Sequence, residues 1–120
     1  MKVAVRNIVD GDRRYRQLFY WCPACAHCHG VRVDDGTATP SPKWTWDGNR
    51  ETPTLSPSVL NFTTTHDENG EPVGQRRTVC HHFVHAGMIE YCSDNPHELN
   101  GKTVPLLDIP ENYGISGEDA

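Results

Sequence analysis

The ten residues WCPACAHCHG, at positions 21–30, hold three cysteines and two histidines. Cys22 and Cys25 form a C-x-x-C pair, whose spacing lets one tight turn direct both sulfurs at the same point. Pro23 presets a backbone φ that suits such a turn. Redox-active C-x-x-C pairs open a helix in a βαβ unit, whereas strand-like residues stand on both sides of this pair. The stretch therefore predicts a metal-binding knuckle between two strands.

A tetrahedral zinc site needs two further ligands, and the second dense supply is the stretch CHHFVH that begins at Cys80. Cys80 is the third predicted ligand. In a regular strand Cys80 and His82 share a face, whereas a bulge or loop would make His81 available. His97 and His29 are the other candidates, so the fourth ligand stays open between these histidines.

The composition favours a structural role for this metal. Only 36% of the 120 residues are hydrophobic, the mean hydropathy is −0.64, and ten glycines and nine prolines interrupt the apolar runs. Such a chain forms a thin core, and small domains of this kind gain from a bound metal. Closing the loop between Cys25 and Cys80 costs on the order of 3 to 4 kcal/mol of chain entropy, which zinc binding could offset.

The apolar pattern predicts a mostly β fold with little helix, built from antiparallel hairpins around a zinc-ribbon-like knuckle. We expect one zinc-stabilised domain over 1–110 and an acidic, flexible tail over 111–120. Asn69-Gly70 and Gly87 mark two hairpin turns, and the stretch 93–101 suggests a single helical turn. Extended segments are expected at 16–21, 31–36, 44–46, 58–65, 76–84, 88–92 and 102–110.

Charge and hydropathy restrict the partners and the location. The net charge is −5 and the pI is about 5.7, which argues against a nucleic-acid-binding surface. The basic cluster at 13–16 follows Asp10 and Asp12 and suggests a solvated strand edge. No apolar stretch approaches the roughly 20 residues that span a bilayer, and no signal peptide is recognisable. We therefore expect a cytoplasmic protein. Disulfides are unlikely in that reducing compartment, and the five cysteines, an odd number, are better explained by a metal.

Several short motifs, in order, resemble a family of small zinc-binding proteins of tailed phages and prophages. Many of its members carry the label "ammonia monooxygenase", which describes a membrane copper enzyme and does not suit this chain. The resemblance covers residues 19–110. The motifs are Cys22-Pro-Ala-Cys25 with His29, PTLSPS at 53–58, Cys80-His81, and a final motif with Asp94, His97, Leu99 and Gly101. Asn95 stands where many members have cysteine. The resemblance favours His81, His29 and His97 over His82 as ligands.

Domains similar to this one also occur beside ubiquitin-activating-type enzymes and ubiquitin-like proteins in bacteria. The resemblance thus implies an adaptor that binds a protein partner and is not an enzyme, encoded by a phage and working in the host cytoplasm. The alternative is a zinc-dependent hydrolase that uses His81, His97 and Asp94 near the metal. A third possibility is a structural part of a virion.

Two mutational expectations follow from these assignments. Pro53 and Pro57 make PTLSPS a rigid lead-in to a strand, so Ser56→Ala and Ser58→Ala should lower stability by about 1 kcal/mol without affecting partner binding. Among the histidines, His81 or His97 should lose most zinc on replacement by alanine, and His82 least.

Overall fold

The computed structural model describes residues 1–34 and 39–111, which form antiparallel β-sheets. Strands β1 (Val3–Asp10), β2 (Arg13–Cys22) and β3 (His27–Val33) make a sheet in the order β1-β2-β3. A four-stranded sheet, ordered β6-β7-β8-β9, consists of β6 (Val59–His66), β7 (Pro72–His85), β8 (Met88–Tyr91) and β9 (Thr103–Pro105). The short strands β4 (Thr45–Trp46) and β5 (Leu55–Ser56) pair with each other. The mostly β prediction is confirmed.

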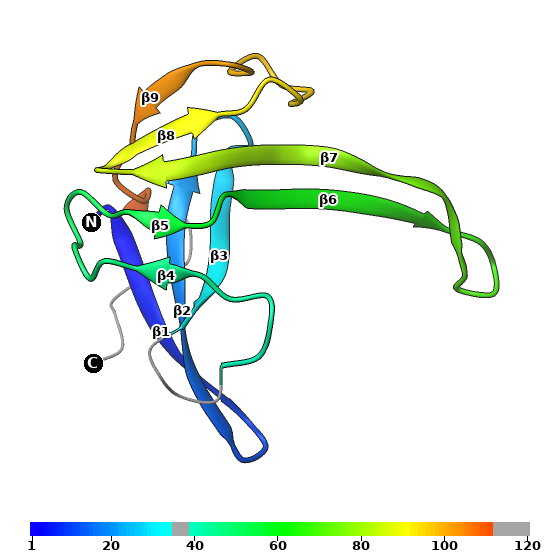
Figure 1. Ribbon diagram of the computed structural model, residues 1–120, viewed down its shortest axis with the longest axis horizontal. Coiled ribbons are helices and arrows are strands. Elements are labelled where there is room, and N and C mark those ends of the chain that lie inside the picture. Colours follow the sequence, from blue (N-terminus) through cyan, green and yellow to red (C-terminus); the bar gives the residue numbers. More distant parts are fainter. Residues whose placement is uncertain (35–38, 112–120) are drawn as a thin grey trace.

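The two larger sheets lie across one another and share one core (Figure 1). Alternation along β2 buries Leu18, Tyr20 and Cys22 on the face that meets the second sheet. The facing sheet contributes further buried side chains, from Val59, Cys80, Val84, Ile89 and Tyr91. The end of β2 therefore meets the middle of β7, and this is where the cysteines of distant segments come together.

The hairpin of β6 and β7 extends well beyond the body of the molecule (Figure 1). The pairing of these strands shifts register between Asn61 and Phe62 and again between Thr63 and Thr65. Bulges of this kind bend a strand pair and increase its twist. Only the inner part of each strand packs on the first sheet, and this part holds the cysteine and histidines of the CHHFVH stretch.

Several expected elements differ from the observed ones. The first strand, β1, was not predicted, and β7 begins at Pro72 and not at 76. The helical turn at 93–101 is wrong, because this stretch forms hydrogen-bonded turns closed by bonds such as Asn100 N to His97 O, at 3.2 Å. Positions 35–36 of one expected strand and 112–120 of the expected tail lie outside the described residues. The domain boundary at 110 stays a prediction.

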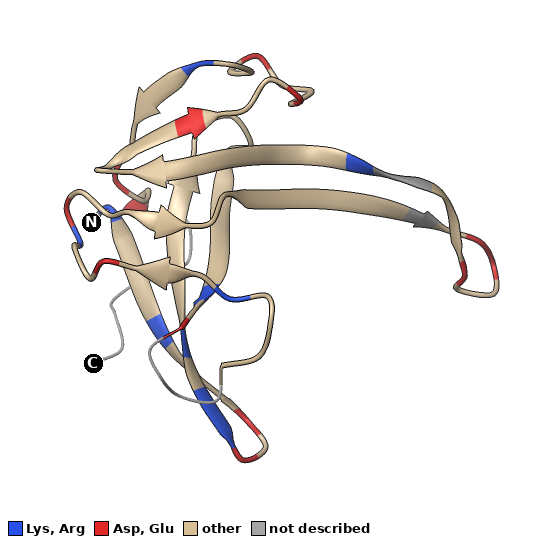
Figure 2. Ribbon diagram, viewed as in Figure 1, with Lys and Arg blue, Asp and Glu red and all other residues tan. Residues whose placement is uncertain are grey.

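Residues of both charges lie at the β1–β2 hairpin tip, whereas the β6–β7 hairpin tip carries acidic residues (Figure 2). Asp10 pairs with Arg13 across the β1–β2 hairpin, and both are exposed. The expected solvated strand edge is only partly right: Arg13 and Arg14 are exposed, but Arg16 is half-buried and pairs with both β1 and β3, because β2 is the central strand of its sheet. Within the described ranges, no helix has the length and apolar character needed to cross a membrane.

Candidate functional site

The C-x-x-C pair occupies the turn between β2 and β3. Cys22 is the last residue of β2, and Ala26 N donates to Cys22 O at 2.8 Å to close the turn. Ala26 adopts a φ of 55°, which allows the chain to reverse within four residues. Cys22 is buried and Cys25 is half-buried, so both sulfurs face the interior as the spacing predicts.

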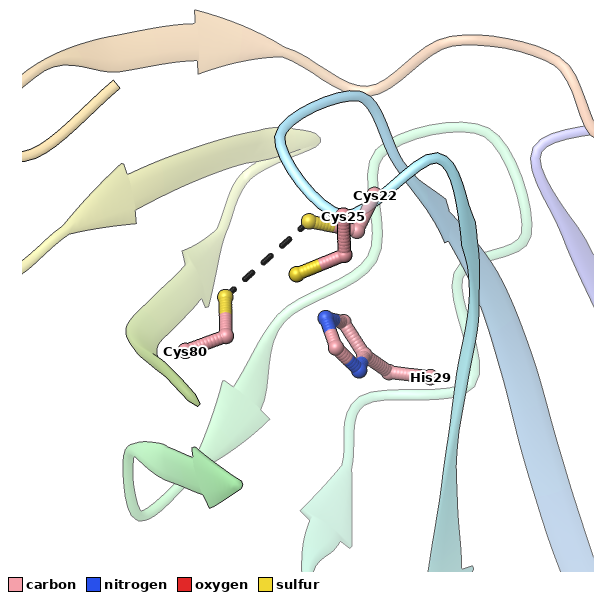
Figure 3. Close-up of side chains that lie close together, drawn as sticks. All are labelled: Cys22, Cys25, His29 and Cys80. Atoms are coloured by element: carbon pink, nitrogen blue, oxygen red, sulfur yellow. Dashed lines mark hydrogen bonds between the residues drawn. The ribbon is translucent and has the colours of Figure 1, made fainter. Parts of the chain in front are cut away.

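Four side chains converge at this turn. One ligand atom from each of Cys22, Cys25, His29 and Cys80 lies within 4.8 Å of all the others, so the cluster could bind a metal ion. Figure 3 shows the three sulfurs and the imidazole ring of His29 around a common space. The Sγ atoms of Cys22 and Cys80 are 4.0 Å apart. Tetrahedral zinc, with Zn–S bonds of about 2.3 Å, places two sulfurs about 3.8 Å apart.

Two observations indicate that this cluster fits a cation. The Nε2 atom of His29 is buried and has no hydrogen-bond partner among the described residues, as expected for a nitrogen that ligates a metal. Burial, with the neighbouring Cys22 sulfur, raises the pKa of Cys25 to about 11. The contact with Cys80 lowers the pKa of Cys22. Three thiolates this close together would repel one another, and a divalent ion would compensate their charge.

Hydrogen-bond donors surround the sulfurs. The Tyr91 hydroxyl lies 3.1 Å from Cys22 Sγ, and His82 Nδ1 lies 3.3 Å from Cys80 Sγ. Burial lowers the pKa of His82 to about 3, so its ring is neutral. Because the Tyr20 hydroxyl lies 2.7 Å from His82 Nε2 and can donate to it, Nδ1 carries the proton and donates to Cys80. His82 thus donates to a member of the cluster and is not one of its four members.

The other two candidate histidines lie outside the four-residue cluster. His97 Nε2 is 3.5 Å from Cys80 Sγ, so His97 contacts the cluster without being one of its four members. His81 belongs to a different group, with Cys92 and Asp94. The structure therefore brings together the three predicted cysteines and His29, and it separates His81 from them.

Ser58, His81 and Asp94 form a hydrogen-bonded series. Ser58 Oγ lies 3.1 Å from His81 Nε2, and His81 Nδ1 lies 3.1 and 3.2 Å from the two carboxylate oxygens of Asp94. These distances match a nucleophile, a base and a carboxylate that orients the base. Ser58 precedes β6, His81 is in β7, and Asp94 follows β8. The fold alone brings them together, since 23 and 13 residues separate them in sequence.

Neighbouring groups hold this series in place. Trp44 Nε1 donates to Ser58 O at 3.1 Å. The Asn95 side chain accepts from His81 N at 2.7 Å and donates to His81 O and Cys92 O at 2.8 and 2.7 Å. Asn95 thereby joins the backbone of β7 to the segment that carries Asp94. A hollow of about 360 Å³ lies next to this segment, lined by Pro23, Ala24, Pro96, His97, Glu98 and Leu99.

The contact between Ser58 and His81 was not predicted. The sequence marked PTLSPS as a motif, but we expected its hydroxyls to serve local structure only. His81 and Asp94 were expected beside the metal, as parts of a zinc-dependent hydrolase. The sequence did contain a signal for this contact. It has a serine motif with no assigned function, and it has a histidine and an aspartate that the proposed metal site does not require.

A serine, a histidine and an aspartate in hydrogen-bonded series are the defining arrangement of serine hydrolases. Residues 2–92 match the model of a family described as bacterial ubiquitination-like system serine protease (BubE). The match covers well over half of the 120 residues, and the chain belongs to this family. Comparison with curated proteins and with solved structures gave no match.

Proposed function

We propose that this chain is a serine protease whose nucleophile is Ser58. The observation that carries the proposal is the contact series from Ser58 Oγ through His81 to Asp94. His81 Nε2 takes the Ser58 proton as Oγ attacks the substrate carbonyl carbon, and then gives this proton to the leaving group. The acyl group stays on Ser58 until water, deprotonated by His81, releases it. Asp94 holds the proton of His81 on Nδ1 throughout.

The metal that we propose for the four-residue cluster is zinc, in a structural role. Three thiolates and one imidazole suit zinc and form a closed tetrahedral set. Such a set leaves no open position for a substrate or a water, so hydrolysis is assigned to Ser58 and not to the metal. We therefore do not favour the alternative function, a zinc-dependent hydrolase that uses His81, His97 and Asp94.

The family's description supports a substrate class. The description names a serine protease of a bacterial ubiquitination-like system. We infer that the substrate is a protein of such a system, and that this substrate is the protein partner expected from the sequence. Phage origin and cytoplasmic location stay predictions.

The test compares two serines that are two residues apart. Wild-type protein should react covalently with a fluorophosphonate probe, which modifies only activated serines, and should hydrolyse an activated ester. Ser58→Ala should abolish labelling and lower kcat/KM by roughly 10⁴-fold or more. Ser56 is exposed and lies outside the series, so Ser56→Ala is the matched control and should label like the wild type.

Mass spectrometry of the labelled protein identifies the modified residue. Both variants should stay folded, because Ser58→Ala removes one hydrogen bond worth about 1 kcal/mol. A folded wild-type protein that takes up no probe, or a Ser58→Ala variant that still does, would refute the proposal. The first of these results would favour the adaptor function that was expected from the sequence.

A further inference from the structure

A second group of metal ligands overlaps the proposed catalytic residues. One ligand atom from each of His81, Cys92 and Asp94 lies within 4.8 Å of the other two. We propose that these three residues form a second binding site for Zn²⁺ and that zinc bound there inhibits the enzyme. The inhibition rests on the proposed function, whereas the binding does not.

The backbone holds the three residues together before any ion arrives. Cys92 N donates to His81 O at 3.0 Å, which joins the end of β8 to β7. The Asn95 amide donates to both carbonyls, at His81 and at Cys92. A preformed arrangement of this kind reduces the conformational entropy that is lost when the ion binds.

This group is open to solution, unlike the buried cluster. The side chains of His81 and Asp94 are 26% and 53% exposed, and Cys92 is half-buried. One sulfur, one nitrogen and one oxygen suit zinc, whereas Mg²⁺ and Ca²⁺ prefer oxygen alone. Three protein ligands leave a fourth position for water, so the ion should bind more weakly here than at the closed cluster and exchange freely.

Binding at this position would remove the general base. The ring nitrogen that faces Asp94 is Nδ1, and it must give its lone pair to the ion. The ring proton then moves from Nδ1 to Nε2, and the Cys92 thiol releases its proton to solvent. An Nε2 that carries a proton cannot accept one from Ser58, which lies 3.1 Å away. The carboxylate of Asp94 would also coordinate the ion.

The experiment titrates zinc-loaded protein with buffered Zn²⁺ and follows ester hydrolysis and metal content together. Wild-type protein should bind a second equivalent of Zn²⁺ and lose activity as it does so, whereas Mg²⁺ at the same concentration should have no effect. With each variant's activity expressed relative to its own rate before Zn²⁺ is added, Cys92→Ser should raise the inhibitory Zn²⁺ concentration at least ~10-fold. Cys28→Ser, which changes a half-buried thiol outside the group, is the control.

Asp94→Asn provides a readout that does not depend on activity, since it should lose the second equivalent of Zn²⁺ while keeping the first. Equal inhibition of wild type and Cys92→Ser, or a second equivalent that survives in both variants, would overturn the inference. A protein without hydrolytic activity whose second equivalent still requires Cys92 and Asp94 would refute the serine protease and leave the zinc site standing.

Discussion

Both polar atoms of the Asn95 side-chain amide form hydrogen bonds with backbone groups. Its oxygen accepts from His81 N, and its nitrogen donates to His81 O and Cys92 O. Its own N–H donates to Asn100 Oδ1 at 2.7 Å. The residue touches none of the reacting atoms, yet it fixes the distance between the segments that carry His81 and Asp94. We therefore expect it to act on catalysis through position alone.

Replacing Asn95 with alanine tests this role. Asn95→Ala removes the acceptor of the His81 N–H, while His81 O and Cys92 O keep backbone donors, and it should destabilise the protein by roughly 1 to 3 kcal/mol. Loss of alignment should lower kcat by about 10- to 100-fold while KM changes little, when both are measured well below the melting temperature. Asn69→Ala, at an exposed hairpin tip, is the control and should leave both constants unchanged. A fall confined to stability, with kcat intact, would contradict the positioning role.

Residue types and their spacing were enough to predict the cysteines of the cluster, but not the contact series of Ser58. Cys22, Cys25 and Cys80 were predictable because few chains place thiols in this pattern without a metal. Ser58 was not, because serine is common and no local motif such as G-x-S-x-G surrounds it. Its proposed function depends on His81 and Asp94, whose positions relative to it are set by the folding of distant segments onto one another. Only the tertiary structure contains that information.

The strand β7 serves both groups of residues. Cys80 and His82 point into the core, toward the cysteines of the knuckle and Tyr20, while His81 contacts Ser58 and Asp94. The two-residue period of a strand makes this separation possible. The sequence predicted the strand and its two turns, because Asn69-Gly70 and Gly87 are strong turn signals. It missed the first residues of β7, since Pro72 and Gly74 are poor strand formers, although Pro72 pairs here with His66 of β6.

The turn between β7 and β8 has a strict requirement for glycine. Gly87 has a φ of +79°, and a Cβ atom added there would lie 3.0 Å from Thr52 Cα. Gly87→Ala therefore combines backbone strain with a clash against main chain and should destabilise the protein by about 2 to 4 kcal/mol. Gly70→Ala is the matched control, with a φ of +80° and nothing within 4 Å of the added atom.

Urea unfolding of the two variants separates strain from crowding. Gly70→Ala should cost only the strain, about 1 to 2 kcal/mol. Equal losses in the two variants would mean that Thr52 moves aside without cost, and that the turn is less tightly packed against the 52–54 segment than the contacts indicate.

The metal cluster connects the two large sheets. Three of its members come from the β2–β3 hairpin, and Cys80 comes from β7 in the other sheet. The core between the sheets is small, so a cross-link at this point should add appreciably to the free energy of unfolding. Metal binding and the packing of the sheets are therefore coupled.

Alanine substitutions of the histidines test which of them completes the cluster. His29→Ala should lower zinc affinity by at least ~10-fold and lower the melting temperature in parallel. His81→Ala should keep both nearly intact while abolishing hydrolysis. The sequence alone predicted the largest loss at His81 or His97, so the series separates the two expectations. Zinc retained in full by His29→Ala would contradict the ligand set derived from the structure.

Cys80 and His81 are neighbours in the chain, so a reagent that extracts the metal also releases the backbone that carries the general base. We expect EDTA to abolish hydrolysis, and a conventional inhibitor panel would then class the enzyme as a metalloprotease. Loss of hydrolysis after a reagent blocks the thiols of Cys22 or Cys25 would in the same way suggest a cysteine protease. Neither class would describe the proposed mechanism, in which the reacting atom is Ser58 Oγ, and only covalent labelling of that oxygen would assign the mechanistic class.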